Sequence, residues 1–207
     1  MQPIILPVTY LGPISYYYFL VNHPVIIECH AHYVKQTYAN RCQILTANGV
    51  QSLTIPIEHR SEKCAIKDVG ISNHTNWQII HWRAIETAYN ATPFFEYYKD
   101  SLQPLFEQPH HNLFSFNLEL QQIILDLLGF KSDLKLSENY IKKYNTGEID
   151  LREELVPKKN SVTLEHLFEH KTYYQNFNHK HDFTPDLSII DLLFNMGNEA
   201  RLVLKKQ

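Results

Sequence analysis

The sequence predicts an α/β protein in which a small mixed sheet, with an N-terminal β-α-β unit and a β-hairpin, packs against a helical C-terminal half. Three observations support this fold class. Two apolar runs, residues 4–8 and 25–29, flank a segment long enough for two helical turns. Asn48-Gly49 lies between two strand-like runs. From residue 76 onward, apolar residues recur at helical spacing.

The N-terminal unit is read from the residues between the two apolar runs. Gly12-Pro13 ends the first run, and a proline at the first helical position favours a helix over residues 14–21. A crossover of this length allows parallel pairing of the flanking strands. Because open α/β sheets bind ligands at the carboxyl ends of their strands, we expect Tyr10 and His30 near one crevice.

The hairpin follows from Asn48-Gly49, a dipeptide typical of two-residue turns. With these two residues as the turn, Ile44 faces Leu53 and Cys42 faces Ile55. These four side chains form one apolar face, which we expect to meet the core. Arg41 then projects from the opposite face and stays available for binding.

The remaining elements are mostly helical. We expect one more strand over residues 65–71 and helices over residues 76–92, 95–106, 112–128, 189–196 and 199–205. In the first helix, Glu86 lies on a stripe with Trp82 and Tyr89, and His81 lies on a neighbouring apolar stripe.

The chain length of 207 residues fits a single domain over residues 1–207. Residues 131–162 are polar, strongly charged and poor in aromatic side chains. This composition is typical of a polar insertion or a mobile flap.

Composition limits the partners. With 19 Lys and Arg against 22 Asp and Glu, the net charge of −3 gives no broad basic surface for nucleic acid. The N-terminal residues lack a basic segment, and prolines interrupt their apolar run, so we expect no membrane span and a cytoplasmic protein. Three cysteines far apart in the sequence do not form a secreted disulfide framework.

The histidines and cysteines match no zinc spacing, and the chain has no Walker or GxGxxG glycine loop. We therefore predict neither a metal nor a cofactor.

Acid-base chemistry is the enzymatic hypothesis that the residues favour. His81 and Glu86 lie on adjoining faces of an aromatic helix and Asp68 lies just upstream, so the three could share one pocket as catalytic residues. A buried histidine satisfied by its neighbours and a core role for the tryptophans are the structural alternatives. Asp186 has the same ambiguity because it could cap a helix.

Several long motifs resemble the WbqC-like family. They are YLGPISYYYFL, ECHAHYVKQTYANRCQILTANG with LTIPI, IKDVGI, WQIIHWRAIETAYNATPFFEYY, FNLEL and PDLSIIDLLFNMG. Judged by motif order, the resemblance runs from about residue 9 to about residue 200. Members take their name from genes of O-antigen and other surface-polysaccharide clusters. The resemblance therefore implies acyl or aminoacyl transfer to an amino sugar, and it carries over no catalytic residue.

One departure concerns the first loop. Many relatives begin with a QPxYxPxxGY-like signature, whereas this chain has LPVTYLGPISY. We therefore expect the first loop to accept a different ligand.

The leading hypothesis is a group-transfer enzyme of surface-polysaccharide precursor metabolism, acting on a small-molecule substrate such as a nucleotide sugar. His81 is its base, oriented by Asp68 or Glu86. Residues proposed to bind substrate are Tyr10, His30, Lys35, Asn40, Arg41, Lys67, Trp82, Tyr89, Asp186 and Asn195, with Arg41, Lys35 and Lys67 holding a phosphate or carboxylate. The alternative is a non-catalytic binding or scaffold protein that recognises a glycan or a protein partner.

Overall fold

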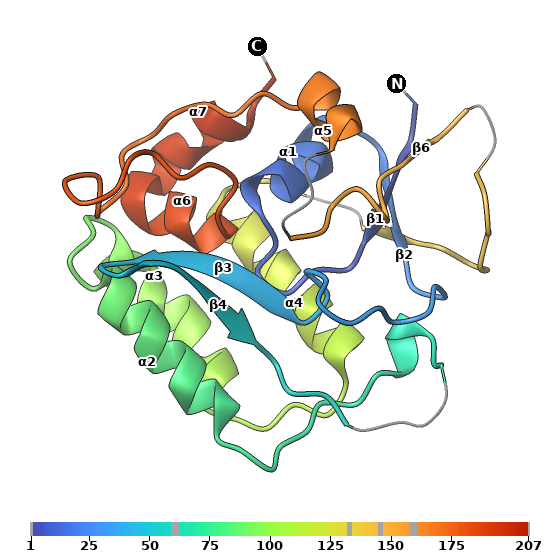
Figure 1. Ribbon diagram of the computed structural model, residues 1–207, viewed down its shortest axis with the longest axis horizontal. Coiled ribbons are helices and arrows are strands. Elements are labelled where there is room, and N and C mark those ends of the chain that lie inside the picture. Colours follow the sequence, from blue (N-terminus) through green and yellow to red (C-terminus); the bar gives the residue numbers. More distant parts are fainter. Residues whose placement is uncertain (1, 59–62, 132–133, 145–146, 158–160, 207) are drawn as a thin grey trace.

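The computed structural model describes residues 2–58, 63–131, 134–144, 147–157 and 161–206. It has a mixed α/β fold, as the sequence predicts, with a parallel sheet, a separate hairpin and a helical C-terminal part (Figure 1). The parallel sheet has four strands in the order β5-β2-β1-β6. They are β1 (Ile4–Pro7), β2 (Val25–Glu28), β5 (Lys135–Leu136) and β6 (Ile149–Asp150).

The N-terminal β-α-β unit is confirmed. Helix α1 (Ile14–Asn22) connects β1 to β2, which pair in parallel with Ile4 opposite Val25. The aromatic side chains of α1 are buried, so this helix is part of the core. The loops that follow β1 and β2 consequently leave the same edge of the sheet.

The hairpin consists of β3 (Arg41–Thr46) and β4 (Gly49–Thr54). Its register differs from the expectation, because Cys42 lies opposite Leu53 and not opposite Ile55. The Thr46 hydroxyl donates a hydrogen bond to the Gly49 carbonyl, so these two residues close the turn. The observed register is thus shifted by two residues from the expected one. Because side chains alternate between the two faces, a shift of two leaves every side chain on its expected face, and the expected apolar face is buried.

The strand expected over residues 65–71 is wrong. The chain forms a short 3₁₀ helix there, Ile66–Asp68, in which the Asp68 N–H donates to the Ala65 carbonyl. Only isolated bridges flank it, such as the one between Ile57 and Ile71. Local turn bonds and single bonds to distant segments, such as Ile66 N–H to the Ala31 carbonyl, therefore satisfy this backbone in place of a strand ladder.

The helices are α2 (Trp77–Tyr89), α3 (Phe95–Leu102), α4 (Leu113–Leu127), α5 (Val162–Leu167), α6 (Ile189–Met196) and α7 (Ala200–Leu204). The helix expected over residues 95–106 is shorter, because its last turn tightens into a 3₁₀ helix around Pro104. Strand β3 packs against α2 and α6, and one hydrophobic core joins the sheet, the hairpin and the helices. None of the described helices is both long and apolar enough to cross a membrane.

Residues 131–162 supply both edge strands of the parallel sheet. Strand β5 pairs with β2 and strand β6 pairs with β1, each over two residues (Figure 1). The polar segment is therefore joined to the sheet within the parts that the structure describes. Its mobility stays a prediction.

Gly197→Ala should be strongly destabilising. Gly197 has a φ of 54°, and a Cβ at this position would lie 2.5 Å from the Phe94 ring. We expect the free energy of unfolding to fall by about 2 kcal/mol or more in urea denaturation. Gly147→Ala is the matched control, because a Cβ there meets nothing within 4 Å. Equal stability of the two variants would contradict the expectation.

Candidate functional site

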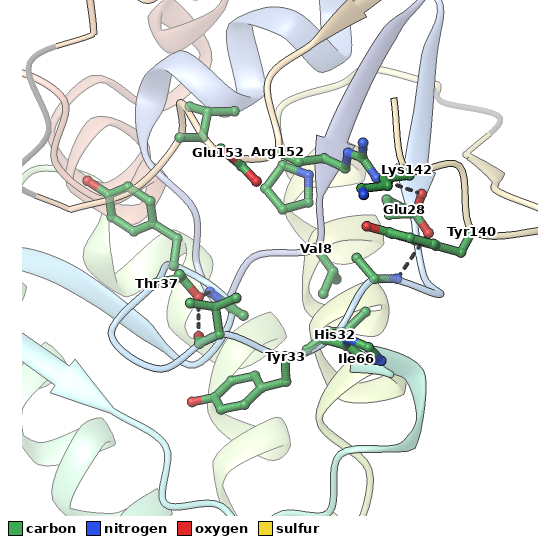
Figure 2. A pocket seen from close by; sticks show the side chains of 16 residues that line it. Val8, Glu28, His32, Tyr33, Thr37, Ile66, Tyr140, Lys142, Arg152 and Glu153 are labelled. Carbon is green, nitrogen blue, oxygen red and sulfur yellow. Dashed lines mark hydrogen bonds and ion pairs between the residues drawn. The ribbon is translucent and has the colours of Figure 1, made fainter. Parts of the chain in front are cut away.

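A cavity of about 240 Å³ lies at the carboxyl ends of β1 and β2, and we call it the first cavity. Pro7 and Val8 line it from the end of β1, Glu28 from the end of β2, and residues 31–34 and 37–39 from the loop that follows β2. Figure 2 shows side chains of this cavity, among them Tyr140, Lys142, Arg152 and Glu153 from the later polar segment. A crevice is therefore present at the sheet edge where open α/β folds bind ligands.

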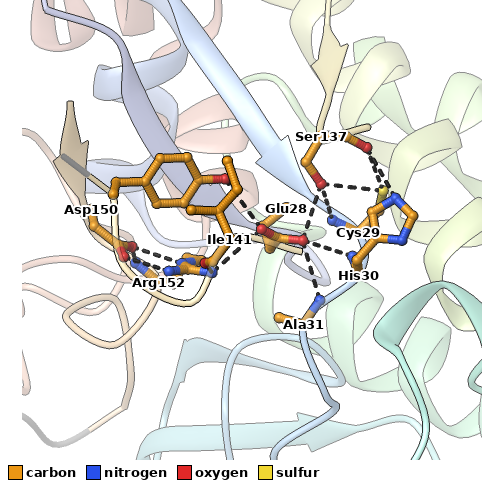
Figure 3. Close-up of polar contacts among 9 residues, drawn as sticks. Glu28, Cys29, His30, Ala31, Ser137, Ile141, Asp150 and Arg152 are labelled. Carbon is orange, nitrogen blue, oxygen red and sulfur yellow. Dashed lines mark hydrogen bonds and ion pairs between the residues drawn. The ribbon is translucent and has the colours of Figure 1, made fainter. Parts of the chain in front are cut away.

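The buried carboxylate of Glu28 organises this edge (Figure 3). Its side chain is 1% exposed. Oε1 accepts hydrogen bonds from the His30 N–H at 2.7 Å, the Ala31 N–H at 3.2 Å and the Ser137 hydroxyl at 3.0 Å. Because Ser137 follows β5, this one oxygen connects the end of β2 to the neighbouring edge strand.

The second oxygen of Glu28 connects β2 to the other edge strand, β6. Oε2 accepts from Nη1 of Arg152 and from the Tyr144 hydroxyl, both at 3.3 Å. Nη2 of Arg152 lies 2.6 Å from Asp150 Oδ2, at the end of β6. Burial and the Glu28 charge raise the pKa of Tyr144 to about 12. The Tyr144 hydroxyl therefore stays protonated at pH 7 and donates a hydrogen bond to Glu28. Glu28 therefore joins the segments that follow β2, β5 and β6, and both of its carboxylate oxygens accept hydrogen bonds from the protein.

The side chains left for a ligand lie on the rim of the first cavity. His32 and Lys142 are exposed and line it. Within the described parts of the chain, neither side chain has a hydrogen-bond or ion-pair partner. Tyr33 and Tyr140 add aromatic surface to the same cavity.

His81 lies in the core and does not line the first cavity. Its side chain is 4% exposed, and Nδ1 lies 2.9 Å from the Tyr10 hydroxyl. The ring of Trp77 packs edge-on against it. Burial lowers the pKa of His81 to about 4, with the backbone of Thr54 acting in the opposite direction. His81 is therefore a neutral histidine satisfied by its neighbours at pH 7.

The other two predicted catalytic residues, Asp68 and Glu86, are exposed. Glu86 lies on the solvent side of α2, because the buried stripe of this helix runs through Trp77, His81 and Ile85. The spacing of α2 keeps Glu86 on one stripe with Trp82 and Tyr89, as predicted, but the Glu86 side chain is exposed. The first cavity is lined by none of the three side chains, and their catalytic roles stay predictions.

Several predicted binding residues have structural contacts. Tyr10 and Asn40 are buried, and Asn40 Nδ2 donates to the Ile55 carbonyl. Trp82 packs against the ring of Phe95 and a second phenylalanine of the core.

Asp186 caps a helix. Its carboxylate accepts from both the N–H and the hydroxyl of Ser15, each at 2.8 Å, in the first turn of α1. The carboxylate thus occupies the helix N-terminus where an anionic ligand would bind.

The basic candidates lie nearer to the first cavity. His30 Nδ1 is 3.1 Å from the Lys67 ammonium, and His30 Nε2 is 3.2 Å from the Ser137 carbonyl beside the Glu28 network. Lys35 is exposed on the loop that lines the cavity. Arg41 is half-buried, and its Nε has no hydrogen-bond partner among the described residues. Burial raises the pKa of Tyr33, and the Arg41 charge acts in the opposite direction.

A second buried carboxylate, Asp191, lies on α6. It accepts from the hydroxyls of Tyr89 at 2.9 Å and Tyr173 at 2.6 Å, and its backbone carbonyl accepts from Asn195. Burial raises the Asp191 pKa from 3.8 to about 6, against the lowering effect of these hydrogen bonds. Tyr89 and Asn195, two of the predicted binding residues, thus form structural hydrogen bonds with Asp191.

Asp191→Asn should change how stability depends on pH. Folded protein binds the Asp191 proton more tightly than unfolded protein, so this group lowers the free energy of unfolding as pH rises through about 6. We expect the variant to gain up to about 3 kcal/mol relative to wild type between pH 4 and pH 7, measured by urea denaturation. His81 acts in the opposite sense, because its lowered pKa costs stability as pH falls below 6.5. An identical pH profile in variant and wild type would contradict this role for Asp191.

The signal for the rim was weak in the sequence. Glu28 is a polar residue at the end of an apolar strand, which is the end of a parallel sheet where ligands usually bind. His32 follows four residues later. Lys142 and Arg152 lie in the polar segment, and only the pairing of β5 and β6 brings them to the same edge. Groups of His, Cys, Asp and Glu suited to a metal ion are absent from the residues that the structure describes.

The fold is that of an α/β protein with a small cavity at the carboxyl ends of its parallel strands. A profile of the WbqC-like protein family matches residues 9–156 and 147–203, so the chain belongs to this family. It is 29% identical over 188 residues to the uncharacterized protein Rv1507c of Mycobacterium tuberculosis, and the match covers 81% of each chain. No solved structure matches the chain at a significant level.

Proposed function

We propose that the protein is a cytoplasmic group-transfer enzyme that moves an acyl or aminoacyl group to an amino sugar in surface-polysaccharide precursor metabolism. The first cavity carries this proposal. It lies where open α/β sheets bind ligands, and it combines aromatic walls with free polar groups on the rim. Membership of the WbqC-like family supports the choice of reaction.

The size of the first cavity favours a small ligand. Pockets for drug-sized molecules measure about 300–1,000 Å³, whereas this one measures about 240 Å³. One sugar ring fits better than an extended glycan. Tyr33 and Tyr140 offer apolar ring faces together with polar hydroxyls, which suits a sugar.

The free cations suit the anionic part of a sugar nucleotide. Lys142 lines the cavity, Lys35 lies on its loop, and the buried Nε of Arg41 has no hydrogen-bond partner among the described residues. Phosphate oxygens accept charge-assisted hydrogen bonds from such groups.

The transfer needs an activated donor and a base. The amine nitrogen of the sugar forms a bond with the carbonyl carbon of the donor, and the bond from that carbon to the leaving group breaks. The leaving group takes the bonding electron pair, and the amine proton passes to the base. His32 has the right chemistry and position, because its imidazole lines the first cavity and is exposed.

Purified protein tests this proposal when it is incubated with an amino sugar, free or as its UDP derivative, and a panel of acyl and aminoacyl thioesters. The product is an amide, detected by mass spectrometry. Thermal unfolding identifies which substrates bind, since a ligand at one hundred times its Kd adds about 2.7 kcal/mol of stability. Binding without product would favour the non-catalytic binding protein, and neither binding nor product would contradict the proposal.

A further inference from the structure

A second cavity, of about 260 Å³, adjoins the first. The two share Tyr38 and Leu155 as lining residues, so they adjoin at these residues. Tyr38 is buried, and its carbonyl accepts a hydrogen bond from the Tyr10 N–H. Tyr38 lies on the loop that follows β2, the same loop that lines the first cavity.

The second cavity has an acidic side and an apolar side. Asp186 and Glu165 provide carboxylates, and Ser161 provides a hydroxyl. Leu164 and Phe168 provide apolar surface. Among the residues that the structure describes, no lysine or arginine lines this cavity, and His170 is the lining side chain that can carry a positive charge. A ligand with one positive charge and a small apolar part would complement it.

Asp186 is the most constrained of these residues. It has a φ of 53°, in the left-handed region that non-glycine residues rarely adopt, and such strain concentrates at functional sites. Each carboxylate oxygen accepts one hydrogen bond, both from Ser15, and keeps capacity for another. Burial raises the pKa of Asp186, while the bonds from Ser15 and the charge of His170 lower it. A cationic ligand would offset this burial of negative charge.

We propose that the second cavity binds the protonated α-amino group of an aminoacyl donor, with Asp186 and Glu165 as its carboxylate partners. This inference rests on the proposed function for the reaction, and it selects aminoacyl over simple acyl transfer. The carbonyl carbon of the donor then lies beside Tyr38, where the two cavities adjoin, and faces the amine of the sugar in the first cavity. A side chain of the donor packs against Leu164 and Phe168.

Two small amides test the recognition of the amino group without any transfer. L-alaninamide carries the ammonium group and carbonyl carbon of an aminoacyl group, and propionamide has the same carbon skeleton without the amine. We expect wild-type protein to bind L-alaninamide at least about tenfold more tightly in isothermal titration. Equal affinities for the two amides would overturn the inference.

Variants locate the site. Asp186→Asn, which suits a left-handed backbone and keeps an acceptor for Ser15, should reduce the preference to about threefold or less. Glu165→Gln should weaken it by about threefold, and because this side chain is exposed, it keeps the test valid if Asp186→Asn fails to fold. Glu169→Gln is the control, because Glu169 is exposed and does not line the cavity. An unchanged preference in Glu165→Gln and in any folded Asp186→Asn would overturn the inference.

The two proposals fail in different ways. A preference for L-alaninamide that depends on Asp186 or Glu165, without amide product from any donor, would support this site and contradict the transfer reaction. Equally fast transfer from donors with and without an amino group would retain the transfer reaction and overturn the aminoacyl site.

Discussion

Replacing Glu28 with alanine is expected to lower the free energy of unfolding by about 3–5 kcal/mol. The substitution removes a buried acceptor that binds two backbone N–H groups, the Ser137 hydroxyl, Tyr144 and Arg152. Donors left without partners in the interior each cost about 1–3 kcal/mol. Two of these donors, Ser137 and Arg152, follow the two edge strands. We therefore also expect the first cavity to change its shape and to bind the amino sugar more weakly.

Urea denaturation measures the loss of stability, with Glu138→Ala as control. Glu138 is exposed and follows Ser137 directly, so its removal should leave stability within about 0.5 kcal/mol of wild type. Glu28→Ala protein as stable as the control would show that the carboxylate does not hold the sheet edges.

Replacing His32 with glutamine is expected to lower the transfer rate by about a hundredfold or more, the usual contribution of a general base. Thermal stability should stay unchanged because the side chain is exposed and lacks a described partner. His179→Gln, which removes another exposed histidine, is the control. The rate of amide formation at saturating substrate provides the measurement.

The same assay separates His32 from His81. His81→Gln should reduce stability, because it disturbs the buried contact with Tyr10, and it should leave the rate of the folded enzyme unchanged. A loss of rate in folded His81→Gln, with none in His32→Gln, would make His81 the base and contradict the site described above.

The N-terminal unit could be predicted because its signals are local. Gly12-Pro13 between two apolar runs indicates a strand, a helix and a second strand, and each run is long enough to recognise. The buried face of the hairpin was equally readable from alternation. Its register was not, because a shift of two residues leaves the same side chains buried and only the hydrogen bonds of Thr46 select the turn.

The edge strands could not be predicted. Strands β5 and β6 have two residues each, too few for a periodic pattern, and they lie in a polar segment. They form because β1 and β2 offer free edges to pair with. The rim residues Lys142 and Arg152 reach the cavity only through this long-range pairing.

The role of His81 illustrates the same limit. Helical spacing correctly places it on an apolar stripe with Trp77, but spacing cannot show whether a buried histidine faces a cavity or a partner. Tyr10, distant in sequence, supplies the partner. Strand direction predicts the end of the sheet at which the first cavity lies, whereas the hydrogen-bond partners of individual polar groups depend on tertiary contacts.

The most direct test of the central claim fills the first cavity. Ala31 lines it, and Ala31→Phe should weaken the binding of D-glucosamine by about tenfold or more in isothermal titration, through steric exclusion. Ala91→Phe, at an exposed position outside the cavity, should bind like wild type. Unchanged affinity in folded Ala31→Phe protein would contradict the assignment of the first cavity as the amino-sugar site.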